Sequence, residues 1–166
     1  MPIPTPALAT VPALDKLDLR ILDRVQLNAR LPAEAIAAEV GLSAAAVQRR
    51  LKRLRETGVI RTEAAQVEPA AVGLALTCVV AVELERENHQ ANDLFRQRIA
   101  AWPQVQQCYY VTGQADFLLV VLAEDMAAYE AFTREALLSD PNVRGFTTSV
   151  VMDRVKVGMT LPIGGA

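Results

Sequence analysis

The sequence has little of the chemistry on which most enzymes and metal sites depend. Its 166 residues include two cysteines, one histidine and 5% aromatic residues. Cys78 and Cys108 cannot build a disulfide framework, and they lack the Cys-x-x-Cys spacing of zinc and redox sites. There is no Ser/His/Asp set, no phosphate-binding loop and no Gly-x-Gly-x-x-Gly motif. We therefore predict no catalytic activity, no cofactor and no bound metal.

Long apolar runs are also missing, although 52% of the residues are hydrophobic. The longest uncharged apolar stretch, Ala70 to Val82, ends at Glu83 and is shorter than the roughly 20 residues of a membrane helix. Residues 1–13 carry no charge, and prolines at positions 2, 4, 6 and 12 interrupt any signal-peptide core. We expect a protein of the reducing cytoplasm that binds no membrane and has a disordered leader over residues 1–13.

Charge is divided unevenly along the chain, although the net charge is only −2. Residues 14–63 contain ten Lys and Arg against seven Asp and Glu, a balance of +3. Residues 64–166 contain seven against twelve, a balance of −5. This difference in sign indicates a basic module joined to an acidic one.

The basic module has the pattern of three short helices. Apolar residues recur at helical spacing over residues 15–26, and Pro32 suits the start of a second helix over residues 33–40. Gly41 is typical of a helix C-cap. Two residues later Ser43 can cap a third helix over residues 44–57, which Gly58 ends.

The third helix separates an apolar stripe from a basic face. Val47, Leu51 and Leu54 share one side, and the stretch from Ser43 to Arg55 holds five positive charges and no acidic residue. A short helix, a glycine turn and a basic second helix form the helix-turn-helix pattern of DNA-binding proteins. Residues 14–67 are therefore predicted to form a winged helix-turn-helix domain, with a short two-stranded wing over residues 59–67. A purely structural helical hairpin remains the alternative.

The pattern changes beyond a hinge predicted at residues 68–75. Alternating apolar residues predict strands over residues 77–85, 105–112, 117–123 and 143 to about 157, with one helix after the first strand and one after the third. This order predicts a ferredoxin-like βαββαβ domain over residues 76–160 and a tail over residues 161–166. The fold class is α+β, with both helices of this domain on one face of a four-stranded sheet.

The other face of that sheet is predicted to be apolar or lined by small side chains. The positions concerned are Val79, Ala81, Val120 and Val150. An uncovered apolar sheet face favours self-association, so we expect a dimer built through this domain.

Five sequence blocks resemble the Lrp/AsnC family of bacterial and archaeal transcription regulators over roughly residues 14–160. They are Leu14-Asp15-x-x-Asp18-x-x-Ile21-Leu22, Gly41-Leu42-Ser43-x3-Val47-x2-Arg50-Leu51-x2-Leu54, Gly58-Val59-Ile60, Val111-Thr112-Gly113-x2-Asp116-Phe117 and Thr148-x2-Val151-Met152. The resemblance implies a sequence-specific DNA-binding regulator. It also implies a homodimer that assembles into octamers, and a C-terminal domain that senses an amino acid or a related small metabolite.

The resemblance also implies where the effector binds. In such proteins the effector lies between dimers, near the turn that joins the two middle strands. Carried over to this sequence, the effector-binding residues are Tyr110, Thr112, Gly113, Gln114, Asp116, Met126, Thr147, Thr148 and Ser149. A glycine turn can present backbone N–H groups to a carboxylate, and Asp116 can accept an α-ammonium group. An aspartate in a strand turn that only binds nearby backbone is the alternative.

Helix geometry and the family's mode of binding together predict which residues contact double-stranded DNA. They are Ser43, Ala45, Gln48, Arg49, Lys52 and Arg53. Gln48 can pair with adenine and Arg49 with guanine, whereas Lys52 and Arg53 are expected to hold phosphates. Arg50 lies beside the apolar stripe, so we expect it to be structural.

Two other functions are compatible with parts of the pattern. Sirohaem decarboxylases resemble this family but use histidines, and this chain has only His89, in a polar stretch at a helix start. An architectural protein that bends DNA without sensing an effector is the second alternative. The uncharged Gln114-Ala115 pair in the turn keeps that alternative open.

Overall fold

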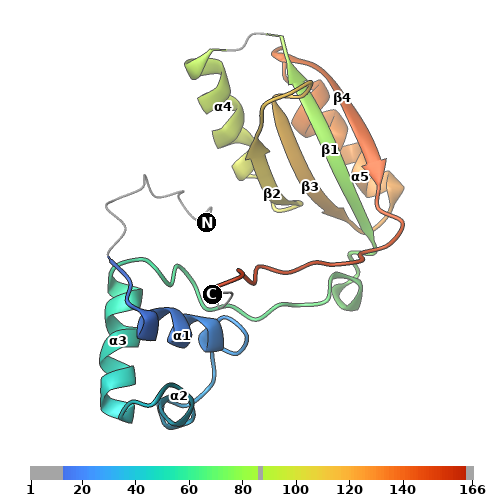
Figure 1. The fold of residues 1–166 in the computed structure, drawn as a ribbon. Coiled ribbons are helices and arrows are strands. Elements are labelled where there is room, and N and C mark those ends of the chain that lie inside the picture. The colour runs from blue at the N-terminus through green and yellow to red at the C-terminus, as the bar shows by residue number, and fades with distance from the viewer. Residues whose placement is uncertain (1–12, 86–87, 164–166) are drawn as a thin grey trace. The chain divides into compact units, whose positions relative to one another are not determined.

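The computed structural model describes residues 13–85 and 88–163 (Figure 1). The described residues divide into two compact units, a helical unit of residues 13–65 and 156–163 and a sheet unit of residues 66–155. Of the predicted leader and tail, residues 1–12 and 164–166 lie outside the described part. No helix within the described ranges is long and apolar enough to span a membrane.

The helical unit contains the three predicted helices, α1 (Lys16–Val25), α2 (Ala33–Val40) and α3 (Ala44–Glu56). Their apolar sides meet in one core. Its buried residues are Ile21, Leu22, Val25, Ile36, Ala37, Val40, Val47, Leu51 and Leu54. The predicted stripe of α3 is thus its buried side, which leaves the basic residues on the remaining surface.

The turn between α2 and α3 forms as its sequence predicts. Gly41 ends α2 with φ at 75°, in the left-handed region, and its N–H donates to the Ala37 carbonyl at 3.0 Å. The Ser43 hydroxyl then accepts from the Ala46 N–H at 3.2 Å and caps α3. Three residues between the helices are enough because Gly41 takes a conformation that other residues rarely adopt.

Two features of the helical unit differ from the sequence-based expectation. Residues 61–68, all of them described, contain neither helix nor strand, so the predicted wing strands are not formed in this chain. The C-terminal residues 156–163 lie against the helices: Gln26 and Leu161 exchange two hydrogen bonds of 2.9 Å, and Ile163 packs on the apolar core. The segment predicted as a tail is therefore partly held by the helical unit.

The sheet unit has the predicted ferredoxin-like order. Its elements are β1 (Leu76–Leu84), α4 (His89–Ala100), β2 (Val105–Tyr110), β3 (Phe117–Ala123), α5 (Met126–Thr133) with a following π-helical turn (Arg134–Leu138), and β4 (Val143–Val150). The strands are antiparallel in the order β2-β3-β1-β4. A short 3₁₀ turn, Pro69–Val72, lies in the predicted hinge.

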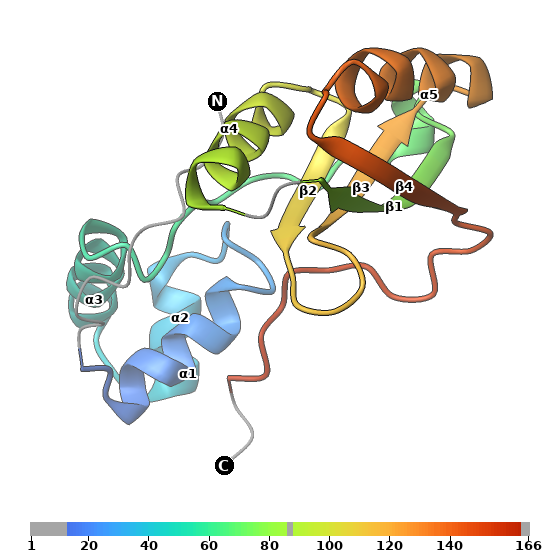
Figure 2. The same ribbon diagram turned by 90° about the horizontal axis from the view of Figure 1, so that it is seen from above.

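Both helices cover one face of this sheet (Figure 2). Alternate strand residues, among them Val80, Val82 and Leu119, are fully buried against Phe95 of α4 and Phe132 of α5. Strand alternation places their neighbours on the open face.

The predicted open-face residues fall on both sides of the sheet. Val79, Ala81 and Val120 lie on the open face and are only half-buried. Val150 does not lie on the open face. It pairs with the buried Cys78 and therefore lies on the helix-covered side, so the prediction for this residue was wrong. The strand that contains it also ends at Val150 and not near Val157. Beyond the Cys78–Val150 pair, the Val151 N–H donates to the Thr77 carbonyl at 2.9 Å, and β1 begins at Leu76, so β1 provides no partner for residues 153–157.

Gly41→Ala should destabilise the helical unit. We expect the free energy of unfolding to fall by about 1–2 kcal/mol, because an L side chain is strained at φ of 75°. Thermal and urea unfolding followed by circular dichroism at 222 nm would measure the loss. Gly158→Ala, in the same unit but outside the left-handed region, is the control and should change stability by less than about 0.5 kcal/mol. Equal effects of the two substitutions would contradict this explanation.

Candidate nucleic-acid interface

The outer side of α3 carries most of the predicted DNA-contacting residues. Ala45, Gln48, Arg49 and Lys52 are exposed, and so is Ser43 at the N-terminus of the helix. They form one continuous surface because residues three and four apart on a helix are neighbours. This surface offers an amide, a guanidinium and an ammonium to a ligand that covers the helix.

The cations on this surface differ in their partners. Arg49 forms no ion pair or hydrogen bond with any residue in the described part of the chain. Lys52 lies 3.7 Å from Glu56, and both side chains are exposed. Such a surface pair contributes little and is easily exchanged for another anion. Arg49 and Lys52 are therefore both available to bind an external ligand.

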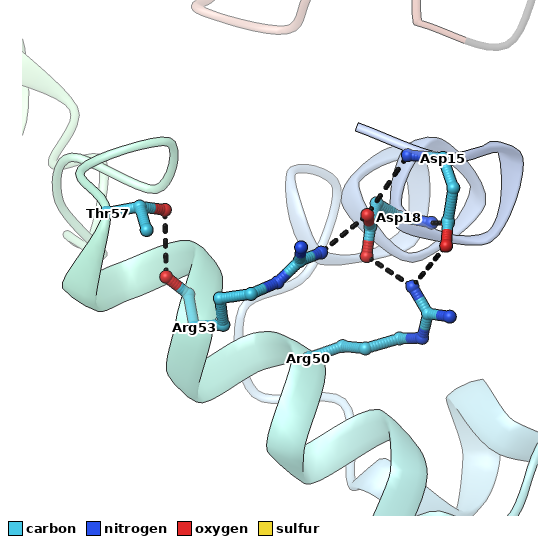
Figure 3. Close-up of polar contacts among 5 residues, drawn as sticks. All are labelled: Asp15, Asp18, Arg50, Arg53 and Thr57. Carbon is cyan, nitrogen blue, oxygen red and sulfur yellow. Dashed lines mark hydrogen bonds and ion pairs between the residues drawn. The ribbon is translucent and has the colours of Figure 1, made fainter. Parts of the chain in front are cut away.

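Two further arginines of α3 turn toward α1 instead (Figure 3). Arg50 Nη1 lies 2.7 Å from Asp18 Oδ1 and 2.8 Å from Asp15 Oδ2. Arg53 Nη2 lies 2.5 Å from Asp18 Oδ2. The predicted structural role of Arg50 matches this geometry. Arg53, predicted to hold a phosphate, already has an ionic partner.

The acids that receive these arginines also cap α1. The Asp15 side chain accepts from the Asp18 N–H at 2.8 Å, and the Asp18 side chain accepts from the Asp15 N–H at 3.1 Å. This reciprocal pair is a capping box, here with aspartate in place of the usual glutamate. The same two carboxylates therefore begin α1 and bind α3.

The ionised form of Asp18 is strongly favoured. Burial alone would raise its pKa, but hydrogen bonds from Arg53, Arg50 and the Asp15 N–H lower the pKa to about 2. The pKa of Asp15 is lowered as well, mainly by the hydrogen bond from the Asp18 N–H. The pKa of Arg50 is raised by its bonds to both acids. At neutral pH the cluster therefore consists of two carboxylates and two guanidinium groups.

The predicted effector site begins at the turn between β2 and β3. Gly113 adopts φ of 127° there, and Asp116 follows. One carboxylate oxygen of Asp116 accepts from the Leu84 N–H at 2.6 Å, and the Asp116 N–H donates to the Val82 carbonyl at 2.9 Å. Asp116 thus ties the turn to the end of β1. The sequence left open a structural Asp116 that bonds to local backbone, whereas the backbone group that it binds here lies on β1, 32 positions away.

The other predicted effector residues are not brought together within one chain. Tyr110 lies beside the turn, whereas Met126 is exposed beyond the opposite end of β3. On β4, Thr147 and Ser149 lie on the open face of the sheet. Thr148 faces the helices, where its hydroxyl and the Tyr129 hydroxyl are 2.5 Å apart. Within one chain these residues therefore lie at the turn, at the start of α5 and on both faces of β4.

Two contributions escaped the sequence analysis. The guanidinium of Arg96 stacks over the Tyr110 ring at 4.9 Å from its centroid, which covers one side of the turn region. The second is the pair Asp15 and Asp18. Their spacing indicates a capping box, but the sequence does not show that the same carboxylates bind α3, because that depends on which helices pack together. The described residues contain no group of three His, Cys, Asp or Glu side chains placed to hold a metal.

Comparisons with known proteins match both units. Residues 77–161 match a family model described as the Lrp/AsnC ligand binding domain. Residues 14–61 match one described as winged helix-turn-helix DNA-binding. The two matches together cover most of the described chain.

Individual relatives extend over nearly the whole length. An uncharacterised HTH-type transcriptional regulator of Sinorhizobium fredii is 49% identical over 90% of this chain and 89% of its own length. The leucine-responsive regulatory protein of Rhizobium meliloti is 34% identical over 86% of this chain and 92% of its own. The crystal structure of a transcriptional regulator of Neisseria meningitidis in complex with L-Met has a TM-score of 0.85 at 34% identity, covering 92% of this chain and 98% of that one.

The Asp18 cluster should make stability depend on pH in acid. The folded-state pKa of about 2 lies below the ordinary 3.8, so its stabilisation is complete above pH 3.8 and is lost as pH falls toward 2. We expect the melting-temperature difference between the wild type and Asp18→Asn to shrink over this interval. Asp23→Asn, the same change elsewhere on α1, is the control and should show no such convergence. A difference between wild type and Asp18→Asn that stays constant from pH 5 to pH 2 would disprove this assignment.

Proposed function

Because this chain belongs to the Lrp/AsnC family, we propose that it is a sequence-specific DNA-binding transcriptional regulator controlled by a small molecule. The observation that carries the proposal is the exposed face of α3, the second helix of the helix-turn-helix, on which Gln48, Arg49 and Lys52 are neighbours. DNA-binding proteins of this architecture place the second helix in the major groove. The relatives compared above are transcriptional regulators, which agrees with a function in binding and not in catalysis.

The proposed division of labour on α3 follows from side-chain chemistry. Arg49 donates two hydrogen bonds to guanine, and Gln48 pairs with adenine through its amide. Ala45 is small enough to contact a thymine methyl group. Lys52 and the N-terminus of α3 at Ser43 bind phosphates, which position the helix without reading sequence.

We further propose that the sheet unit binds an amino acid. The support is the match to the ligand-binding domain of the family and the structural relative crystallised with L-Met. The turn that includes Thr112, Gly113 and Gln114 would supply one side of the site. Met126 and the β4 residues Thr147, Thr148 and Ser149 lie apart from that turn in one chain, so a neighbouring subunit would have to contribute them.

Assembly into a homodimer, and from there into an octamer, belongs to the same proposal. The open face of the sheet carries half-buried apolar side chains, among them Val79, Leu118, Val120 and Leu122. A face of this kind is stabilised when a second copy removes it from water. Analytical ultracentrifugation would measure the assembly directly.

Arg49→Ala should reduce sequence preference more than overall affinity. We expect discrimination between DNA from upstream of the protein's own gene and a random duplex of equal length to fall by about 5- to 150-fold, the equivalent of about 1–3 kcal/mol for a lost bidentate base contact. Fluorescence anisotropy at several salt concentrations would measure it.

Two controls accompany the Arg49→Ala measurement. Lys52→Ala should weaken binding to both duplexes alike and flatten the salt dependence by about one unit of slope. Arg30→Ala removes an exposed charge outside α3 and should leave the discrimination unchanged. Equal binding of wild-type protein to both duplexes, with no response to Arg49→Ala, would contradict the regulator function.

An amino-acid effector should raise the melting temperature of the protein. At a free concentration of 100 times its Kd, a ligand stabilises the folded state by about 2.7 kcal/mol. We expect one or a few of the twenty L-amino acids, tested singly with L-methionine among them, to produce such a shift. Gln114→Arg, in the exposed turn, should abolish it, whereas Gln106→Arg on β2 is the control and should retain it. If no amino acid shifts either the melting temperature or DNA binding, the architectural alternative is favoured.

A further inference from the structure

The positive charges of α3 are not equally available to a polyanion. The helix carries five cations, and two of them, Arg50 and Arg53, are bound to carboxylates of α1. Arg50 is mostly buried by this contact, but 44% of the Arg53 side chain stays exposed. Arg53 is therefore a surface cation whose charge is already compensated within the protein.

The Arg53 pair differs from the other ion pairs along α3. Its acid, Asp18, has a side chain only 1% exposed, so the carboxylate cannot turn to water if the arginine leaves. In the Lys52–Glu56 pair both groups are more than half exposed and lie 3.7 Å apart. A DNA phosphate can displace an exposed glutamate at small cost, whereas uncovering a buried carboxylate costs several kcal/mol. Lys52 is thus free to bind phosphate, and Arg53 is held back.

We propose that Asp18 limits sequence-independent affinity by acting as a built-in counter-charge that holds Arg53 away from DNA phosphates while Arg49 reads the bases. This inference rests on the proposed function. It replaces the phosphate contact that the sequence predicted for Arg53.

The physical reason is the origin of non-specific affinity. Binding that is independent of sequence comes from phosphates neutralised by the protein, and each contributes about 0.9 to the slope of log K against log salt. Withholding Arg53 lowers affinity for every duplex, but it removes no base contact. A phosphate contact strengthens specific and random binding alike, so this loss reduces overall affinity and the salt slope and leaves the choice among sequences to the base-reading residues. Asp18 also holds α3 in place through Arg50, so it orients the base-reading side chains.

The experiment measures salt slopes for four proteins: wild type, Asp18→Asn, Arg53→Gln and the double variant. The probes are DNA from upstream of the protein's own gene and a random duplex of the same length. Asp18→Asn should steepen the slope on random DNA by about 0.9 and raise the affinity for random DNA, because Arg53 is released. Arg53→Gln alone should change the slope by less than about 0.3, since the charge it removes touches no phosphate. In the double variant the slope should return to the wild-type value.

A matched control separates release of Arg53 from a simple change of net charge. Asp23→Asn removes one negative charge from the same helix, and the Asp23 side chain is bonded to Gln26 and not to α3. It should leave the salt slope and the affinity for random DNA close to the wild-type values. If Asp23→Asn steepens the slope as much as Asp18→Asn does, the effect is long-range charge and the proposal is wrong.

Folding of the variants does not limit the test. If Asp18→Asn fails to fold, Arg53→Gln decides alone, because it leaves Asp18 bound to Arg50 and Asp15. A slope lower by about 0.9 in Arg53→Gln would show that Arg53 already neutralises a phosphate, which would overturn the proposal but leave the proposed function intact. If the wild-type protein instead binds the upstream duplex no better than the random one, the proposed function is rejected.

Discussion

The helical unit depends on a buried carboxylate that meets two arginines. Asp18 is removed from water, and an unpaired charge there would cost several kcal/mol. Arg50 and Arg53 satisfy it because residues three apart on a helix share one side. Their side of α3 must therefore face α1. Once the rotation of α3 is set in this way, Gln48 and Arg49 can only point outward.

The same packing of α3 on α1 also determines which of the α3 cations have an ionic partner. The basic stretch of α3 looks from the sequence like one uniform polycationic surface, yet its members have different surroundings. Arg49 is without a partner among the described residues, Lys52 has an exposed and weak one, and Arg53 has a buried and strong one. In the proposed function, affinity for phosphate and selection among bases therefore depend on different side chains.

The sheet unit follows a different principle, because the function proposed for it depends on subunits beyond one chain. Alternation buries one set of strand residues under α4 and α5 and leaves another apolar set on the open face. The Asp116 carboxylate already accepts a hydrogen bond from the Leu84 N–H, and the other proposed effector residues lie apart from it within one chain. The proposed site would be complete only when subunits associate, so under this proposal ligand binding and assembly are expected to be coupled.

Local patterns were enough to predict the helices, the order of strands in the sheet unit, the turn at Gly41 and the buried stripe of α3, because each depends on residues close together along the chain. They were wrong about the wing strands, which do not form in residues 61–68. Patterns were not enough where a residue's partner is distant in sequence. The partner of Arg53 is 35 positions away, and that of Asp116 is 32 away. The same limit explains why β4 does not extend to Val157, since β1 begins at Leu76 and cannot pair with residues 153–157, and it explains the position of residues 156–163 on the helices. Propensity and periodicity act over a few residues, whereas pairing of charges and strands is settled only when the chain is packed.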